Sequence, residues 1–342
     1  MARLRAPDPE KEARLAKLLQ QHGADALLVA DRANIAWLAE GADVHCDLFG
    51  VHGVARLLWS PARRVVLTSV IEAARLAEEE FGAAWEIESG PWWSERELPR
   101  DRRILSDLEG DPLAEVRTPF TRADEERLRA LGRDAAEASA EALLAIRPLE
   151  RELDIAARWI AALRARDIHA PVCLVAADER AFQHRHPIPG ERRFARNLLA
   201  GMCGTRHGLV VCLSRLCSVG APDAELARRH RAVLEVERAL HDATRPGRTL
   251  GLALQAGMDA YRAVGFADEW RLHHQGGSLG YRTRERIATP GDATPIVAGQ
   301  SYGWNPSIAG AKAEDAILCG GEVLTRVPHW PSVLGRPDIL RV

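Results

Sequence analysis

The chain has 342 residues, which is enough for two domains of ordinary size. Apolar residues make up 46% and charged residues 27%, a balance typical of a folded globular protein rather than a disordered one. The formal net charge of −2 provides no overall field that would attract nucleic acid or an anionic membrane surface. No apolar stretch approaches the ~20 residues that a membrane-spanning helix needs.

The cysteines and the N-terminus indicate the compartment. The six cysteines are scattered through apolar segments without C-x-x-C spacing, so we expect reduced, mostly buried thiols and no zinc knuckle. Residues 1–19 are charged throughout and lack the apolar core of a signal peptide. Both features favour a cytoplasmic protein.

The first third of the chain alternates between helix and strand patterns. Asp8 and Pro9 are suited to begin a helix, and Gly23 is suited to end it. The apolar run at 25–31 predicts a buried strand, and a second strand is expected to start near 35–38. The remaining expected elements are strands at 54–59, 64–68 and 84–87, with a helix over 70–81. This alternation predicts an α/β domain that ends near residue 117.

The rest of the chain, residues 118–342, is expected to form a second domain. Thr121 can cap a long helix over 124–146, which Pro148 stops. The runs at 197–204 and 208–215 have hairpin-like spacing. The other expected elements are helices over 152–166, 224–244 and 250–264, an apolar strand at 171–177, and a glycine-rich region of strands and turns at 270–342.

Three stretches of the second domain resemble a known family in order and spacing. They are FQHRHPIPGERRFARNLLAGMCGTRHGLVVCLSR (182–215), HHQGGSLGYRTRE (273–285) and GQSYGWNPSIAGAKAEDAIL (299–318). Together with the pattern GADALLVADRANI near the N-terminus, they resemble the creatinase/aminopeptidase P/prolidase family, also called pita-bread enzymes. The resemblance implies a creatinase-like α/β N-terminal domain followed by an α+β pita-bread domain.

The resemblance also implies a metal site with five ligands, and this sequence departs from it. The positions of the family's two aspartates fall at Gly201 and Cys212, and that of its metal histidine falls at Gly277. The two glutamate positions hold Asn305 and Glu314, so one carboxylate remains. A pair of divalent cations needs several anionic ligands, so we expect no metal and no cofactor.

A single zinc ion on Cys212, His274 and Glu314 is an alternative, since three protein ligands suffice for a catalytic site. It would require a thiol on a strand that the family builds around a carboxylate. We therefore favour Cys212 as a small buried apolar side chain.

Four residues are candidates for catalysis. His184 lies at the position of the histidine that the resemblance makes a general acid and base, and His186 is the fallback. An imidazole suits this role because its ordinary pKa lies near neutrality. His274 matches the first histidine of the family's glycine-rich turn, and Glu314 is the expected base or holder of a cation.

A further set of polar and aromatic side chains is expected to bind the substrate. Lys312 and Glu314 alternate on a strand and should face the same side, with Asp315 on the other. Arg284 replaces another family histidine and favours an anionic ligand. The complete set of expected substrate-binding residues is Trp270, His273, Gln275, Tyr281, Arg284, Trp304, Asn305 and Lys312. At least one of the two tryptophans is expected to form a wall of the cleft.

These features lead to a functional hypothesis with two alternatives. We expect a metal-independent hydrolase that cleaves a C–N or amide bond in a small polar molecule carrying a carboxylate. The first alternative is a catalytically silent pita-bread domain that binds a peptide or a partner protein, as in related histone-chaperone subunits. The second is an Xaa-Pro-type metallopeptidase. The resemblance implies a homodimer, and neither nucleic acid nor a membrane is an expected partner.

Overall fold

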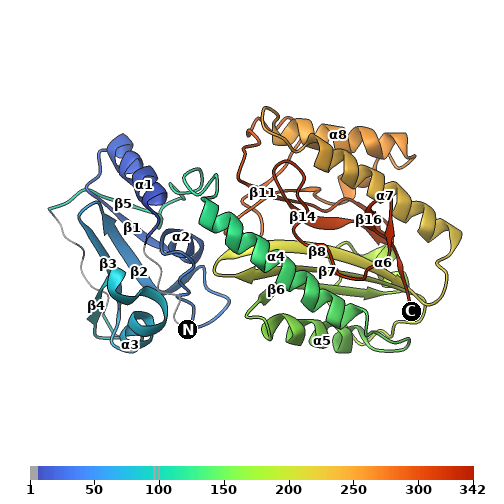
Figure 1. The fold of residues 1–342 in the computed structure, drawn as a ribbon, viewed down its shortest axis with the longest axis horizontal. Helices are drawn as coiled ribbons and strands as arrows, with labels where there is room; N and C mark the ends of the chain where they lie inside the picture. The colour runs from blue at the N-terminus through green and yellow to red at the C-terminus, as the bar shows by residue number, and fades with distance from the viewer. Residues whose placement is uncertain (1–6, 95–97, 99–100) are drawn as a thin grey trace. The chain divides into compact units, whose positions relative to one another are not determined.

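The computed structural model describes residues 7–94, 98 and 101–342, so residues 1–6 of the charged N-terminus lie outside the described part. The chain divides into two compact units, drawn in blue to cyan and in green to red in Figure 1. The first unit extends to Asp124 and includes His207–Leu209, and the second comprises Glu125–Arg206 and Val210–Val342. The division therefore falls a few residues after the expected boundary, at the start of a long helix.

The N-terminal unit is built on a five-stranded mixed sheet in the order β4-β3-β2-β1-β5. Its strands are β1 (Ala26–Asp31), β2 (His52–Ser60), β3 (Arg63–Ser69), β4 (Glu86–Gly90) and β5 (Ile104–Ser106). Helix α1 (Pro9–His22) begins and ends as predicted. The Asp8 carboxylate accepts a hydrogen bond from the backbone N–H of Glu10, and Gly23 adopts a left-handed conformation with φ of 58°.

Two predictions for this unit need correction. Residues expected to start a strand form helix α2 (Arg32–Leu38) instead, because the Asp31 side chain accepts hydrogen bonds from the backbone of Ala33 and Asn34 and caps the helix. The expected helix over 70–81 is shorter: α3 (Ala73–Arg75) leads into a wider π-helical turn, η1 (Leu76–Phe81). A 3₁₀ turn, η2 (Gly82–Ala84), follows.

The C-terminal unit is organised around an eight-stranded sheet in which the order β10-β9-β11-β14-β8-β7-β6 is continuous and β17 pairs with β8. Its strands are β6 (His169–Ala177), β7 (Asn197–Arg206), β8 (Leu209–Ser218), β9 (Gly276–Leu279), β10 (Arg286–Ile287), β11 (Ser301–Trp304), β14 (Glu314–Leu318) and β17 (Leu340–Arg341). Two small ribbons pair β12 (Ser307–Ile308) with β13 (Ala311–Lys312), and β15 (Ser332–Val333) with β16 (Arg336–Pro337). The predicted hairpin joins β7 to β8 through His207 and Gly208, both at positive φ.

Helices surround this sheet (Figure 1). They are α4 (Arg122–Leu143), α5 (Glu152–Arg164), α6 (Glu179–Gln183), α7 (Ala224–Ala243), α8 (Leu250–Ala263) and the 3₁₀ turn η3 (Glu269–Leu272). The predicted cap of α4 is confirmed, because the Thr121 hydroxyl accepts from the Asp124 N–H while the Asp124 carboxylate accepts from the Thr121 N–H. Helix α5 packs on β6, and α7 packs on α8, β11 and β13.

The core of the C-terminal unit joins the α7–α8 pair to the sheet. Leu240, Tyr261, Tyr302 and Trp304 are fully buried within one apolar cluster. Across the described residues, no helix combines the length and the apolar character needed to cross a lipid bilayer. The described cysteines have free thiols, of which Cys203, Cys212 and Cys217 are buried.

Candidate functional site

The three sequence motifs converge on one cavity in the C-terminal unit. The cavity has a volume of about 410 Å³, which suits a small molecule. The lining residues supplied by the motifs are His186, Ile188, Gly201, Met202, Cys203, His274, Thr283, Arg284, Asn305, Lys312 and Glu314. The first half of β6 supplies the remaining lining residues.

Glu314 lies at the floor of this cavity with its charge compensated. It is paired in register with Ser214 on the neighbouring strand β8, so both side chains project from the same face of the sheet. The Ser214 hydroxyl donates to Glu314 Oε2 at 2.7 Å. Lys312 Nζ lies 3.1 Å from the same oxygen, and Arg284 Nη2 lies 3.3 Å from Oε1. Lys312 and Glu314 thus lie side by side, but they belong to the separate strands β13 and β14, so the prediction that they alternate on one strand is wrong.

These contacts decide the protonation state of Glu314. Burial opposes its ionisation, but Lys312, Arg284 and the Ser214 hydroxyl outweigh burial and hold the pKa of Glu314 at about 2. The carboxylate is therefore charged at neutral pH. Two fixed cations face one fixed anion, so this part of the cavity carries one excess positive charge.

Three imidazoles gather at the same cavity. His186 and His274 line it, and Nε2 of His186 lies 2.9 Å from Nε2 of the buried His273. Burial lowers the pKa of all three, to about 2 for His273 and about 4 for His274. His184, the preferred proton carrier in the sequence analysis, is exposed at the end of α6 and does not line the cavity. Of the two candidates for the proton carrier, His184 and His186, the structure brings His186 to the cavity.

Sequence reasoning missed the residue that positions His186. The Arg185 guanidinium reaches across to Glu269 in η3 at 2.5 Å and to the Ser307 hydroxyl at 3.2 Å. These two contacts hold the segment after α6 against the turn that carries His273. An arginine between two histidines gives no such signal in the sequence, because both partners lie more than eighty residues away.

Several expected substrate-binding residues have structural roles instead. Gln275 is buried, accepts from the Tyr261 hydroxyl at 2.8 Å and donates to the His273 carbonyl. Trp304 is fully buried and donates to the Thr244 hydroxyl.

Neither Trp304 nor Trp270 lines the cavity, so the expectation of a tryptophan wall is wrong. Trp270 packs against the apolar core, and Arg271 stacks over its ring. The Tyr281 hydroxyl accepts from Arg127 and also lies outside the cavity.

The positions that the resemblance assigns to metal ligands differ in the space around them. Gly277 has a φ of 155°, and a Cβ atom there would lie 2.1 Å from the Arg286 carbonyl oxygen. A side chain cannot fit at this position without moving the backbone. At Gly201 the nearest obstacle is the rotatable Ser214 hydroxyl, 2.8 Å from an ideal Cβ. Cys212 is fully buried beside Gly303, and burial raises the pKa of its thiol well above the ordinary value.

Unpartnered polar atoms also mark the cavity. Asn305 Oδ1, Arg284 Nε, His273 Nδ1 and His274 Nδ1 are buried and have no hydrogen-bond partner among the described residues. Buried polar groups are seldom left unsatisfied without a ligand or water to pair with them. Their concentration here favours this cavity as a binding site for a polar molecule.

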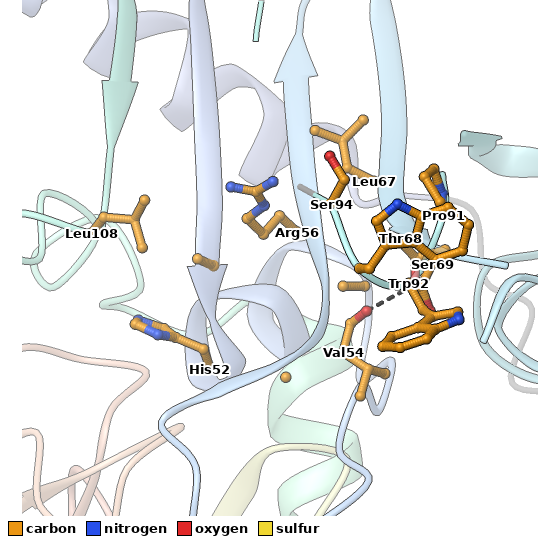
Figure 2. A pocket seen from close by; sticks show the side chains of 14 residues that line it. His52, Val54, Arg56, Leu67, Thr68, Ser69, Pro91, Trp92, Ser94 and Leu108 are labelled. Atoms are coloured by element: carbon orange, nitrogen blue, oxygen red, sulfur yellow. Dashed lines mark hydrogen bonds between the residues drawn. The ribbon is translucent and has the colours of Figure 1, made fainter. Parts of the chain in front are cut away.

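A second cavity, of about 480 Å³, lies in the N-terminal unit (Figure 2). Its wall includes His52, Arg56 and the largely exposed Trp92, and the Thr68 hydroxyl donates to the Val54 carbonyl at its rim. None of the three motifs contributes to it. The cavity of the C-terminal unit is therefore the candidate site.

Comparison with known proteins identifies the family. The model of metallopeptidase family M24 matches residues 126–323, more than half of the chain. The chain belongs to metallopeptidase family M24. It is thus a member of a family of hydrolases, and all the residues that line the cavity lie within the matched region. A probable dipeptidase PepE of Mycobacterium tuberculosis is 27% identical over 125 residues, which span 34% of this chain and a third of that protein.

Solved structures confirm the fold of both units. X-Pro aminopeptidase from Thermotoga maritima MSB8 superposes with a TM-score of 0.76 at 17% identity, over 97% of this chain and 99% of that one. Prolidase from Pyrococcus horikoshii OT3 superposes with a TM-score of 0.75 at 16% identity, over 92% of this chain and 98% of that one. The N-terminal domain of the FACT complex subunit SPT16 from chickpea superposes with a TM-score of 0.67 at 10% identity, over 94% of this chain and 97% of that one. The predicted α/β domain followed by a pita-bread domain is therefore confirmed.

Proposed function

We propose that this M24 family member hydrolyses a C–N or amide bond in a small, peptide-like molecule that carries a carboxylate. The observation behind the proposal is the group of Lys312 and Arg284 around the single carboxylate of Glu314. The excess positive charge at the floor of a small cavity suits an anionic substrate. The unpartnered Asn305 Oδ1 and His274 Nδ1 can pair with polar groups of that substrate.

We further propose that the reaction does not use the family's metal pair. Among the five positions that the resemblance assigns to metal ligands, Glu314 is the one carboxylate, and its charge is already balanced by two cations. Gly277 has no room for a ligand, and the buried Cys212 holds its proton. Two divalent cations need several anionic oxygen ligands, so this set does not fit them.

The proposed chemistry is general acid–base catalysis by an imidazole. His186 lines the cavity, and its lowered pKa leaves the ring neutral near pH 7. It can take a proton from the water that attacks the amide carbon and return it to the departing amine, which balances the protons of hydrolysis. Such proton transfer contributes about 10²–10⁴-fold to a rate. Lys312 and Arg284 would position the substrate carboxylate.

An Xaa-Pro-type metallopeptidase is a second candidate, and the names of the similar proteins favour it. Those matches include a probable dipeptidase, a prolidase and an X-Pro aminopeptidase. It would require ligands other than the residues described above. A silent binding domain is a third candidate, which the likeness to the SPT16 domain supports at the level of fold.

The test is a turnover screen by mass spectrometry with dipeptides, Xaa-Pro peptides and N-acyl amino acids. The purified chain is used before and after chelation, and its metal content is measured. We expect turnover that survives chelation, is lost in His186→Gln and Lys312→Met, and persists in the matched control His184→Gln. Two equivalents of metal with turnover abolished by chelation would establish the metallopeptidase. Binding of these peptides without turnover would establish a catalytically silent binding domain.

A further inference from the structure

Three histidines form a compact group beside the cavity. His186 follows α6, whereas His273 and His274 precede β9, so the group joins two distant segments of the chain. One ring nitrogen from each residue lies within 4.8 Å of the others. The rings of His273 and His274 stack with centroids 4.6 Å apart, and the ring of His186 meets that of His273 edge to face.

The hydrogen bonding of this group is incomplete. In the 2.9 Å contact between His186 and His273, one Nε2 must donate a proton that the other accepts. The Nδ1 atoms of His273 and His274 have no partner within the described part of the chain, although His273 is only 8% exposed. A buried imidazole with a free nitrogen is a costly arrangement unless something else binds it.

We propose that His186, His273 and His274 bind a single zinc-class transition-metal ion. In a tetrahedral site with Zn–N distances near 2.0–2.1 Å, the ligand nitrogens lie about 3.3 Å apart. One ring nitrogen of each residue already lies within 4.8 Å of the other two, so side-chain rotations can bring the three nitrogens to this separation. This site is distinct from the five positions that the family resemblance assigns to metals, and zinc bound there would compete with the acid–base role proposed for His186.

The protein would leave one coordination position open. Three protein ligands with an open fourth position are the usual arrangement of a zinc ion that contacts a substrate or water. His186 is exposed and His274 lines the cavity, so the fourth position can be reached from solution. The buried imidazoles are neutral at pH 7, which leaves their lone pairs available for a metal.

The charges around the group give the site a specific property. Lys312 and Arg284 oppose a cation there, and Glu314 offsets only part of that effect. A carboxylate held by Lys312 and Arg284 would offset their repulsion of the metal ion. The same carboxylate can occupy the fourth coordination position of the ion. Zinc and a small carboxylate should therefore bind cooperatively, each raising the affinity of the other.

The experiment measures metal binding, so its outcome does not depend on whether the chain is a hydrolase. The full chain is stripped with a chelator and titrated with ZnSO₄ by calorimetry, or with CoCl₂ while the visible spectrum is recorded. We expect one equivalent of zinc, a tetrahedral cobalt spectrum, and a tighter zinc affinity in the presence of acetate, a carboxylate with no bond to hydrolyse.

Variants identify the ligands. His186→Gln and His274→Gln should each weaken zinc binding at least tenfold, whereas the matched control His184→Gln, two residues from His186, should bind as the wild type does. Circular dichroism verifies that each variant is folded. Absence of zinc binding by the wild type, or equal binding by all three variants, would overturn the proposal.

Discussion

Lys312 Nζ lies 3.1 Å from Glu314 Oε2, and both side chains are less than 10% exposed. The two residues are separated by one position, yet they lie on different strands, β13 and β14. A buried ion pair is weak evidence for stability as a whole, but removing one partner leaves a buried charge that is poorly compensated. The pair therefore links the fold of the C-terminal unit to the charge of its cavity.

Lys312→Met should destabilise the protein, because Glu314 would keep Arg284 as its one remaining cation. We expect a loss of about 2–4 kcal/mol in the free energy of unfolding at pH 7, measured with urea. The control is Glu322→Gln, which breaks a more exposed pair with Arg129 in the same unit and should cost less than about 1 kcal/mol. Equal effects of the two substitutions would contradict the argument.

Glu314 should also make stability depend on pH in a defined window. Its pKa is about 2 in the folded chain and ordinarily 4.5, so its contribution is present above pH 4.5 and is lost as the pH falls toward 2. The difference in unfolding free energy between the wild type and Glu314→Gln should narrow by about 2 kcal/mol between pH 5 and pH 3. Urea unfolding at each pH measures it, and a constant difference would refute the assignment.

Trp304 and Asn305 are neighbours that should respond differently to substitution. Trp304→Phe removes the hydrogen bond from the buried indole to Thr244, which should cost about 1–2 kcal/mol of stability and leave carboxylate binding unchanged. Asn305→Ala removes a cavity side chain whose Oδ1 has no partner in the described chain, so it should weaken ligand binding with little effect on stability. Calorimetric titration and urea unfolding of both variants separate the two roles.

Gly277→Ala should be strongly destabilising, because its Cβ would meet the Arg286 carbonyl and its φ of 155° disfavours any side chain. We expect a loss of more than about 3 kcal/mol. Gly247→Ala is the matched control: it also has a positive φ but open space around its Cβ, so it should cost about 1 kcal/mol. If both variants unfold at the same urea concentration, the close backbone approach at Gly277 does not contribute to the cost of the substitution.

The sequence predicted most elements because their ends carry strong local signals. Asp8, Gly23 and Thr121 act through neighbours a few residues away, so their effects can be read from a short window. Residues 35–38 were predicted wrongly as strand, since a short apolar run fits either structure. The cap from Asp31 decided in favour of a helix.

The site was predicted at the level of its motifs but not of each side chain. Spacing alone placed His184 at the site, whereas the contacts of Arg185 with distant residues bring His186 there. The motif containing Trp304 and Asn305 does not reveal which of the two faces the core. That choice follows from the packing of α7 and α8 on the sheet, which depends on the whole unit.

The close approach of strands β9 and β10 at Gly277 also decides where a side chain can be added near the candidate site. With the Arg286 carbonyl oxygen 2.1 Å from an ideal Cβ at that position, any side chain there would require the two strands to separate. At Gly201, which lines the cavity, the obstacle is a hydroxyl that can rotate away, so a side chain can be introduced there without moving the backbone.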